Sequence, residues 1–441
     1  MDDAVRNTLL GSIAGNRLTL LVGAGLSMSA PSNLPPARVV AQVCYDAFVA
    51  RVDELPPEIR DDLEAVAEAI AQKVDFRNVF IRAIVPWDKL VGPPNDGHFA
   101  IADLLLSGGA QACLSANYDN LIEQAGAAYG ADLQSALFGD EATELAATQS
   151  PLLKFHGCMI KDRDHTVWTK EQFAQDVILT ARRASNVDWM KANLRRKDIL
   201  IVGFWSDWSY LNDVFEAAFD DVLPLSITIV DPETAENLAA KAPALWALAN
   251  QEHVRFNHVP LRSHVFLGEL QNEIGKKFFR QLLQLGAAAF GNQRPQDDLP
   301  AEVTAPPALD NTAYYAWRRD AAGLTDRQPV RSVLPEPTSE MTGYAHILLR
   351  RAGGVVQPNG YDVGGVSVRV VNGAGRALPD VQRVFAAGPA VDEADVVICA
   401  GATDFGVPGN IIRAGQAATT VRDGVEGRWL TLPDAVVELQ L

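Results

Sequence analysis

The sequence contains few cysteines and no closely spaced pair of them. Its four cysteines are Cys44, Cys113, Cys158 and Cys399, and no C-x-x-C motif occurs among the 441 residues. A structural zinc site built from four cysteines needs such paired ligands, so a site of this kind is excluded. Because three of the four lie in apolar runs, we expect buried thiols and no metal.

Long hydrophobic runs are also absent. No stretch reaches the roughly 18 to 20 apolar residues that a membrane-spanning helix needs, so we expect no membrane partner. The start of the chain, MDDAVRNTLL, is acidic and lacks the basic and then apolar segments of a signal peptide. We therefore expect a cytoplasmic protein.

The sequence also has no excess of positive charge. The chain has 38 lysines and arginines against 55 aspartates and glutamates, which gives a formal net charge of -17. Binding to nucleic acid depends on lysine and arginine side chains that displace counter-ions from the phosphates. We therefore expect no direct nucleic-acid binding.

Short apolar runs rich in valine, isoleucine and leucine recur through the first two thirds of the chain. Such continuous runs are typical of parallel strands that are buried on both faces, and the intervening segments are long enough for crossover helices. The sequence therefore predicts a doubly wound parallel Rossmann-like α/β domain with about six strands. The runs are 18–22, 111–116, 151–155, 198–202, 226–230 and 254–259.

The spacing of apolar residues and prolines predicts further elements and the domain boundaries. Spacings of three and four predict one amphipathic helix that presents Ile59, Leu63, Val66, Ile70 and Val74. The catalytic domain is predicted over 1–290, and a linker with four prolines over 291–311. Residues 312–441 are rich in glycine and predict a smaller α+β or β-rich domain for interaction or regulation.

Glycines and polar residues follow three of the predicted strands. Ligands of open parallel sheets bind outside the carboxyl ends of the strands, so we expect these residues to meet at one crevice. They are Gly23, Ala24, Gly25 and Ser27 after the first strand, Asn117 and Asp119 after the second, and His156 after the third. A Gly-x-Gly turn lets main-chain N–H groups approach phosphate oxygens, and a helix N-terminus after it would add a favourable dipole. The alternatives are a tight turn without a ligand and, for Asp119, a helix cap.

The order of five motifs, GAGLS, ANYD, KFHG, IVGFWSD and IVDP, resembles the sirtuin-like superfamily of NAD-consuming proteins. The resemblance covers roughly residues 15 to 235. It looks closest to the bacterial branch with an Asn-Tyr-Asp core that is found in antiphage defence systems. His98 falls where that branch usually has a histidine that opens a helix, and we interpret it as structural.

The resemblance implies a role for each matched position. Asn117 would hold the attacking water or a ribose hydroxyl, Asp119 would recognise the nicotinamide carboxamide, and His156, with an ordinary pKa, would be the general base. The positions implied to bind the rest of NAD+ are Gly23, Ala24, Gly25 and Ser27 at the pyrophosphate and nearby ribose, Gly203 and Phe204 at the phosphate and ribose end, and Val230 and Asp231 at the adenine ribose.

Departures from the family narrow the expected reaction. Deacetylating sirtuins carry a four-cysteine zinc module and a proline-aspartate-phenylalanine-arginine segment, and both are missing here. Ala116 replaces the glutamine that usually precedes the catalytic asparagine. An acyl-lysine groove is thus unsupported, and water becomes the natural acceptor.

The expected function is an NAD+ glycohydrolase that yields nicotinamide and ADP-ribose, as the effector of an antiphage (abortive infection) system. The alternatives are a non-catalytic sensor of NAD or ADP-ribose, and an NAD-dependent transferase, either a deacylase or an ADP-ribosyltransferase. By the same resemblance we expect a homo-oligomer, a partner subunit such as a HerA-like ATPase, or both.

The segment IVGFWSDWSYLNDVF allows two interpretations. Trp205 and Trp208 flank Asp207 and could form a pocket wall. Tyr210, with the apolar residues that follow it, has the spacing of core positions on a helix.

Overall fold

The structure is a computed structural model of the chain. It describes residues 2–219, 225–323, 333–386, 394–403 and 428–441. These residues form two compact units, Met1–Ala127 with Leu133–Leu270 and Ala128–Asp132 with Gln271–Leu441. None of the described helices is both long enough and apolar enough to cross a membrane.

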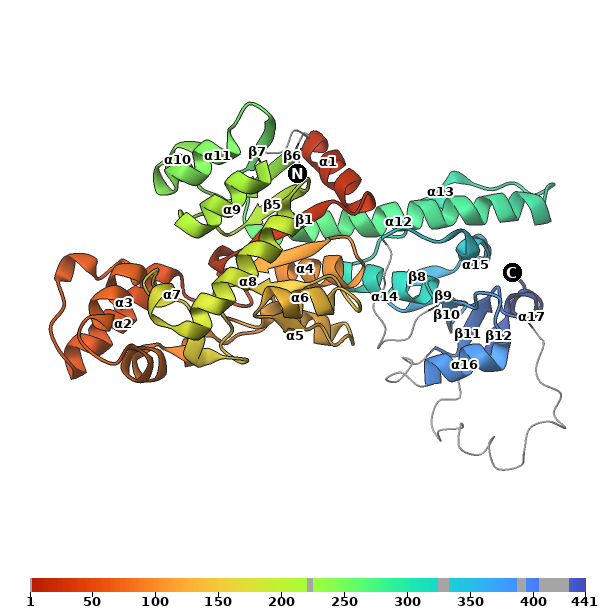
Figure 1. Ribbon diagram of the computed structural model, residues 1–441. Helices are drawn as coiled ribbons and strands as arrows, with labels where there is room; N and C mark the ends of the chain where they lie inside the picture. The colour runs from red at the N-terminus through yellow and green to blue at the C-terminus, as the bar shows by residue number, and fades with distance from the viewer. Residues whose placement is uncertain (1, 220–224, 324–332, 387–393, 404–427) are drawn as a thin grey trace. The chain divides into compact units, whose positions relative to one another are not determined.

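The first unit is built on a parallel sheet in the order β3-β4-β2-β1-β5-β6-β7 (Figure 1). Its strands are β1 (Leu18–Val22), β2 (Ala112–Ser115), β3 (Ser135–Ala136), β4 (Leu152–Lys154), β5 (Asp198–Val202), β6 (Leu225–Val230) and β7 (Val254–Val259). All side chains of β1 and β5 are buried, as in a sheet that is covered on both faces. The predicted Rossmann-like fold is confirmed, with β3 as an edge strand beyond the six predicted runs.

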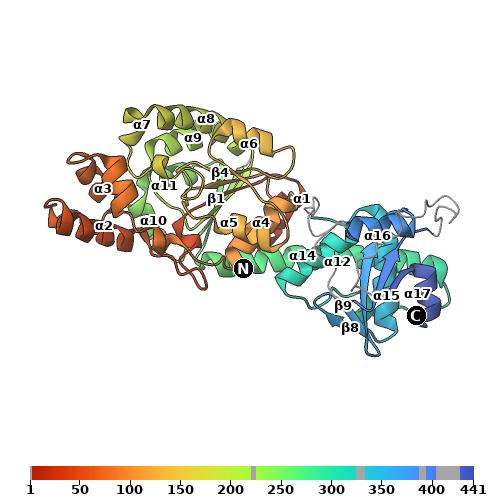
Figure 2. The ribbon, with the colours of Figure 1, turned by 90° about the horizontal axis from the view of Figure 1, so that it is seen from below.

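Helices cover both faces of this sheet. The helical segments of the first unit are α1 (Asp3–Ala14), η1 (Ala24–Leu26), α2 (Ala37–Arg51), η2 (Pro57–Ile59), α3 (Leu63–Ala71), η3 (Phe76–Ile84), η4 (Trp87–Leu90), α4 (Asp96–Leu106), α5 (Leu121–Ala128), α6 (Gly139–Leu145), η5 (Arg163–His165), α7 (Gln172–Gln175), α8 (Val177–Leu194), α9 (Ser209–Phe219), α10 (Ala235–Lys241), α11 (Pro243–Ala249) and the start of α12 (Ser263–Gln293). Figure 2 shows α8 and α9 on one side of the sheet and α4 and α5 on the other. Crossover connections that run in opposite directions from β1 produce this arrangement.

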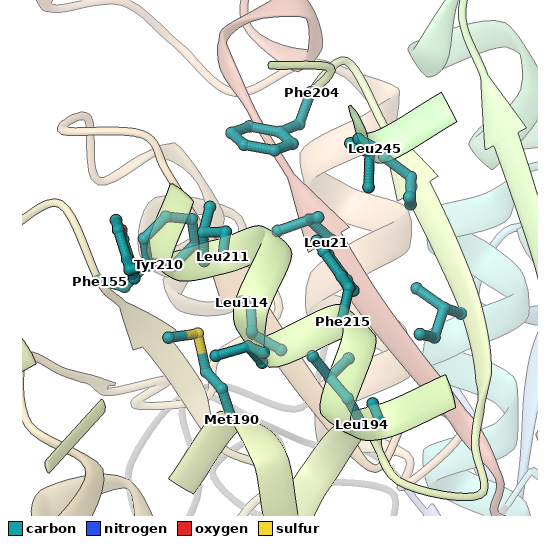
Figure 3. Packing of buried hydrophobic residues seen from close by; sticks show 14 of the residues in the cluster. Leu21, Leu114, Phe155, Met190, Leu194, Phe204, Tyr210, Leu211, Phe215 and Leu245 are labelled. Carbon is teal, nitrogen blue, oxygen red and sulfur yellow. The ribbon is translucent and has the colours of Figure 1, made fainter. Parts of the chain in front are cut away.

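The core on the α8 and α9 face is continuous. Leu21 and Leu114 project from the sheet, and Leu211 and Phe215 of α9 pack against them (Figure 3). Each of these side chains is almost fully buried, which stabilises the fold by about 1.5–3 kcal/mol per residue. This core fixes the sheet and therefore the loops at the carboxyl ends of its strands.

The predicted helix between the first two strands is shorter than its apolar stripe. Pro57 starts a separate 3₁₀ turn that contains Ile59, and α3 begins only after Asp62, whose carboxylate accepts from the Ala65 N–H. Val74 lies beyond the end of α3. The apolar spacing was therefore right over α3 alone, because a proline and a helix cap set the start.

The second unit has a mixed sheet in the order β12-β11-β10-β9-β8. Its described elements are α13 (Ala301–Thr304), α14 (Asn311–Ala321), η6 (Pro337–Ser339), α15 (Glu340–Arg351), β8 (Val355–Gln357), β9 (Gly360–Val363), β10 (Val366–Asn372), α16 (Leu378–Ala386), β11 (Val396–Ala400), β12 (Arg428–Thr431) and α17 (Leu432–Glu438), with the remainder of α12. The strands β8, β9 and β10 are antiparallel neighbours, and β10, β11 and β12 are parallel. This small mixed sheet agrees with the predicted α+β class.

The units do not divide at the predicted residue 290. That position lies inside α12, and the division falls after Leu270. Within the second unit, Phe278, Leu282 and Phe290 of α12 are core residues. The predicted linker 291–311 contains the end of α12 and all of α13, and its first proline, Pro295, comes only after α12 has ended.

Candidate active site

The glycines after β1 permit a close approach of two loops. The N–H of Gly23 donates to the Val202 carbonyl (3.1 Å), and the N–H of Gly25 donates to the Gly203 carbonyl (3.0 Å). A Cβ atom at Gly25 would lie 2.7 Å from the Cα of Gly203, which itself has φ +61°. The loops after β1 and β5 therefore pack backbone against backbone, and only glycine fits there. In open sheets this position, where the strand order reverses, is where ligands bind.

The turn after β1 differs from the predicted phosphate cradle. A 3₁₀ turn, η1, follows the strand, and the next α-helix starts only at Ala37. The N–H groups of Gly23 and Gly25 are already bonded to the loop after β5, and that of Ser27 donates to the Ala24 carbonyl (3.0 Å). Among the described residues, no acceptor is found for the N–H of the exposed Ala24. This N–H remains available to an anionic oxygen.

The Ser27 hydroxyl connects three segments of the chain. It accepts from the Asn117 Nδ2 (3.3 Å) and donates to the Asp119 Oδ2 (2.9 Å). The His98 Nε2 lies 3.1 Å from the same oxygen. Four predicted positions are thus hydrogen-bonded in one cluster, although sequence separates Ser27 from Asn117 by ninety residues.

The partners of His98 settle which ring nitrogen carries the hydrogen. The Asn95 N–H donates to Nδ1 (3.1 Å), so the neutral ring has its hydrogen on Nε2 and donates it to Ser27. His98 is the third residue of α4 and forms a capping box with Asn95. Burial lowers the pKa of His98 to about 3, which keeps the ring neutral. The structural interpretation of His98 accounts for its cap, but the side chain also holds Ser27.

The loop after β2 is held from both sides of Asn117. The Asn117 N–H donates to the Ser115 Oγ (3.2 Å), and the Asp119 Oδ1 accepts from the N–H of Leu121, the first residue of α5 (3.1 Å). Asp119 is therefore both a helix cap and a member of the Ser27 cluster. Asn117 is 6% exposed, and no donor to its Oδ1 is found among the described residues. This oxygen is free to accept from a ligand or water.

His156 lies just beyond β4 at the same edge of the sheet. The turn that follows it uses Gly157, with φ +98°, and His156 is 5% exposed. Its Nε2 lies 2.9 Å from the hydroxyl of Tyr210. Burial lowers the pKa of His156 to about 3, so the expectation of an ordinary pKa is wrong. The imidazole is neutral at physiological pH.

Aromatic rings enclose His156. The ring centroids of Phe155 and Trp208 each lie 4.5 Å from that of the imidazole. Tyr210 is a buried core residue of α9, as its spacing predicted, yet its hydroxyl contacts the candidate base. Sequence reasoning missed this contact, because a helical spacing cannot distinguish a tyrosine that only packs from one that also bonds.

The remaining predicted positions differ in their surroundings. Phe204 is 7% exposed and belongs to the core cluster in Figure 3, so only its main chain can line a ligand. Val230 ends β6 and is fully buried. Asp231 follows it at the sheet edge, partly exposed, with its Oδ1 accepting from the Glu233 N–H (2.9 Å). Its second carboxylate oxygen can accept from ribose hydroxyls.

The cysteines are buried and unbridged, as predicted. Within the described residues, no group of three or more histidine, cysteine, aspartate or glutamate side chains could hold a metal ion.

Comparison with known proteins gives one match to a family and several to solved structures. A mutant of a Sir2 homologue in complex with ADP ribose is 17% identical, with a TM-score of 0.34 over 61% of this chain and 95% of that one. A Sir2 homologue in complex with NAD is 18% identical, with a TM-score of 0.32 over 60% of this chain and 91% of that one.

No protein with a curated description matches the chain. The sequence model of the SIR2-like domain matches residues 111–246, which include β2, β4 and the residues Asn117, Asp119 and His156. Residues 111–246 of the chain are thus similar to the SIR2-like domain.

Proposed function

We propose that this protein is an NAD+ glycohydrolase that cleaves NAD+ to nicotinamide and ADP-ribose. The observation that supports this most is the cluster formed by Ser27, Asn117 and Asp119 at the sheet edge that also holds His156. Three successive parts of the chain supply these groups at the carboxyl ends of parallel strands, where ligands of such sheets bind.

The chemistry requires little beyond orientation and a proton acceptor. Breaking the nicotinamide N-glycosidic bond develops oxocarbenium-like charge on the ribose, and nicotinamide leaves as a neutral molecule. No acid is therefore needed. Water must be held against the ribose carbon, and its proton must be taken away.

Asn117, Asp119 and His156 would carry these tasks. The Asn117 Nδ2 is bonded to Ser27, which orients the free Oδ1 to accept from water or from a ribose hydroxyl. Asp119 would accept from the nicotinamide carboxamide. His156 would take the proton, since burial lowers its pKa and keeps the imidazole neutral.

The loops after β1, β5 and β6 would hold the rest of the nucleotide. Ala24 offers a free N–H for the pyrophosphate, with Gly23, Gly25 and Gly203 giving the ligand close access to the backbone. At the adenosine end, the main chain of Phe204 and the carboxylate of Asp231 would complete the site.

The surroundings of His156 favour water as the acceptor. Phe155, Trp208 and Tyr210 pack against the imidazole, which leaves only 5% of the residue exposed. A small acceptor such as water fits an enclosed base better than a peptide does. The absence of the family's glutamine before Asn117 points the same way.

The biological role that we propose is that of an effector in an antiphage (abortive infection) system, which depletes NAD+ in an infected cytoplasm. Such an enzyme must be held inactive otherwise, and the second unit is the candidate for this control because all of it except Ala128–Asp132 lies outside the SIR2-like match. A second copy of the chain, a HerA-like ATPase subunit, or both would be its partner.

The reaction products show whether water or an acylated peptide is the acceptor of the ADP-ribose group. The protein is incubated with NAD+ under activating conditions, with and without an acetylated peptide, and the products are separated by chromatography. We expect nicotinamide and ADP-ribose in equal amounts, and the same yield with the peptide. Peptide-dependent formation of O-acetyl-ADP-ribose would contradict hydrolysis, as would binding of NAD+ without any product.

A further inference from the structure

A buried lysine lies behind the candidate site, and the proposed chemistry does not use it. Lys154 is the last residue of β4 and its side chain is 0% exposed. A cation in such a place is costly unless it is paired and hydrogen-bonded. The groups that contact the Lys154 ammonium group therefore indicate the role of this buried charge.

The Lys154 ammonium group contacts the loop before α5 and the first turn of that helix. It donates to the main-chain carbonyl of Asp119, and its Nζ lies 3.1 Å from the Oε1 of Glu123. A third contact is to the Cys158 Sγ at 3.6 Å. Burial is the largest influence and opposes the charge of Lys154, but Glu123, Cys158 and Asp119 together outweigh it and raise the pKa of the lysine.

Asp119 is thus held at two separate points. Its carboxylate accepts from Ser27 and from the Leu121 N–H on the side of the site. Its carbonyl accepts from Lys154 on the opposite side. The preceding carbonyl, of Tyr118, accepts from the Met159 N–H (2.9 Å), so the end of β4 and the loop after it fix two successive peptide units.

We propose that Lys154 is a positioning residue, which fixes the main chain of Asp119 so that its carboxylate meets the nicotinamide end of the bound nucleotide. Glu123 is the counter-ion that allows the ammonium group to stay charged while buried. The inference rests on the proposed function, since Asp119 is assigned to nicotinamide there.

If Lys154 has this role, its removal should weaken the binding of NAD+ but not that of ADP-ribose. Without the ammonium group, Asp119 loses the bond to its carbonyl, while the loops that hold phosphate and adenosine are unchanged. Affinity for NAD+ should therefore fall, and affinity for ADP-ribose, which lacks nicotinamide, should not. A lysine that only supported folding would affect both ligands alike.

The experiment is calorimetric titration of NAD+ and ADP-ribose into the full chain and three variants. Lys154→Met removes the cation. Lys154→Met with Glu123→Gln also removes the carboxylate that would be left unpaired, so this double variant recovers stability if Lys154→Met folds poorly. Arg182→Met is the matched control, since Arg182 is a buried cation that also holds a carboxylate (Asp162, 2.7 Å) and a carbonyl (His165, 2.8 Å).

We expect Lys154→Met and the double variant to raise the Kd for NAD+ about tenfold, the loss of a charged hydrogen bond, with the Kd for ADP-ribose within twofold of wild type. Arg182→Met should leave both Kd values within twofold. Equal weakening of both ligands, full recovery of NAD+ affinity in the double variant, or no change would each overturn the role of Lys154. A wild-type protein that binds neither ligand would overturn the proposed function, and this inference with it.

Discussion

The Nε2 atom of His156 lies 2.9 Å from the hydroxyl oxygen of Tyr210, and both side chains are buried. Burial raises the pKa of Tyr210 well above its usual value, so the phenol stays protonated. One ring nitrogen of His156 is therefore committed to a fixed neutral partner. In the proposed reaction the proton would therefore be taken by the other ring nitrogen, Nδ1.

Tyr210→Phe should lower turnover without changing NAD+ affinity. The substitution retains the ring that packs in the core but removes the hydroxyl that orients the imidazole, a loss of about 0.5–1.5 kcal/mol. We expect kcat to fall about three- to tenfold with KM unchanged. Tyr45→Phe is the matched control, because Tyr45 donates to the Leu55 carbonyl (2.8 Å) away from the site. Equal kcat values for Tyr210→Phe and wild type would contradict the orienting role.

The pH dependence of kcat/KM should lack the acid limb of an ordinary histidine. A base works in its neutral form, and His156 with a pKa of about 3 is neutral at all pH values well above 3. We expect kcat/KM to stay level between pH 8 and pH 5 in initial-rate measurements. A half-maximal value near pH 6.5 would show that the active base titrates as an exposed histidine does, and would contradict this assignment.

His98 should make the stability of the protein depend on pH. Its pKa is about 3 when folded and about 6.5 when unfolded, so the unfolded chain binds an additional proton between these values. The stabilisation is complete above pH 6.5 and is lost as the pH falls toward 3. His98→Gln can keep both hydrogen bonds of the ring but cannot titrate.

The comparison of wild type with His98→Gln isolates the contribution of this proton to the free energy of unfolding. Between pH 6.5 and pH 5, the free energy of unfolding of the wild type should fall relative to that of the variant by roughly 1 kcal/mol per pH unit. Urea unfolding at several pH values measures the difference. A constant difference over this range would show that His98 is not buried in its neutral form.

Local sequence patterns predicted the strands but not the contacts between loops. The run at 18–22 coincides with β1, since a buried parallel strand must be apolar throughout. The edge strand β3, Ser135–Ala136, has only two residues and leaves no such run. The glycines after β1 were predicted to approach phosphate, whereas Gly25 mainly allows contact with Gly203, a pairing that only the fold creates.

The placement of the candidate residues at one edge of the sheet could be predicted from the sequence, but their electrostatics could not. The carboxyl ends of parallel strands share one edge of a sheet, so Asn117 and His156 could be assigned to one crevice. The low pKa of His156 comes from its burial by residues such as Trp208, which is distant in sequence. Lys154 was visible in the KFHG motif, but its burial and its bond to Asp119 depend on tertiary packing.

The measurement that tests the central claim most directly is the release of nicotinamide from NAD+ by wild type, Asn117→Ala and His156→Ala under identical activating conditions. We expect the wild type to release nicotinamide and ADP-ribose in equal amounts. Each variant should be slower by about 10²- to 10⁴-fold while binding NAD+ with nearly unchanged affinity, because its lost contact acts mainly in the transition state. Nicotinamide release by His156→Ala at the wild-type rate would contradict the account.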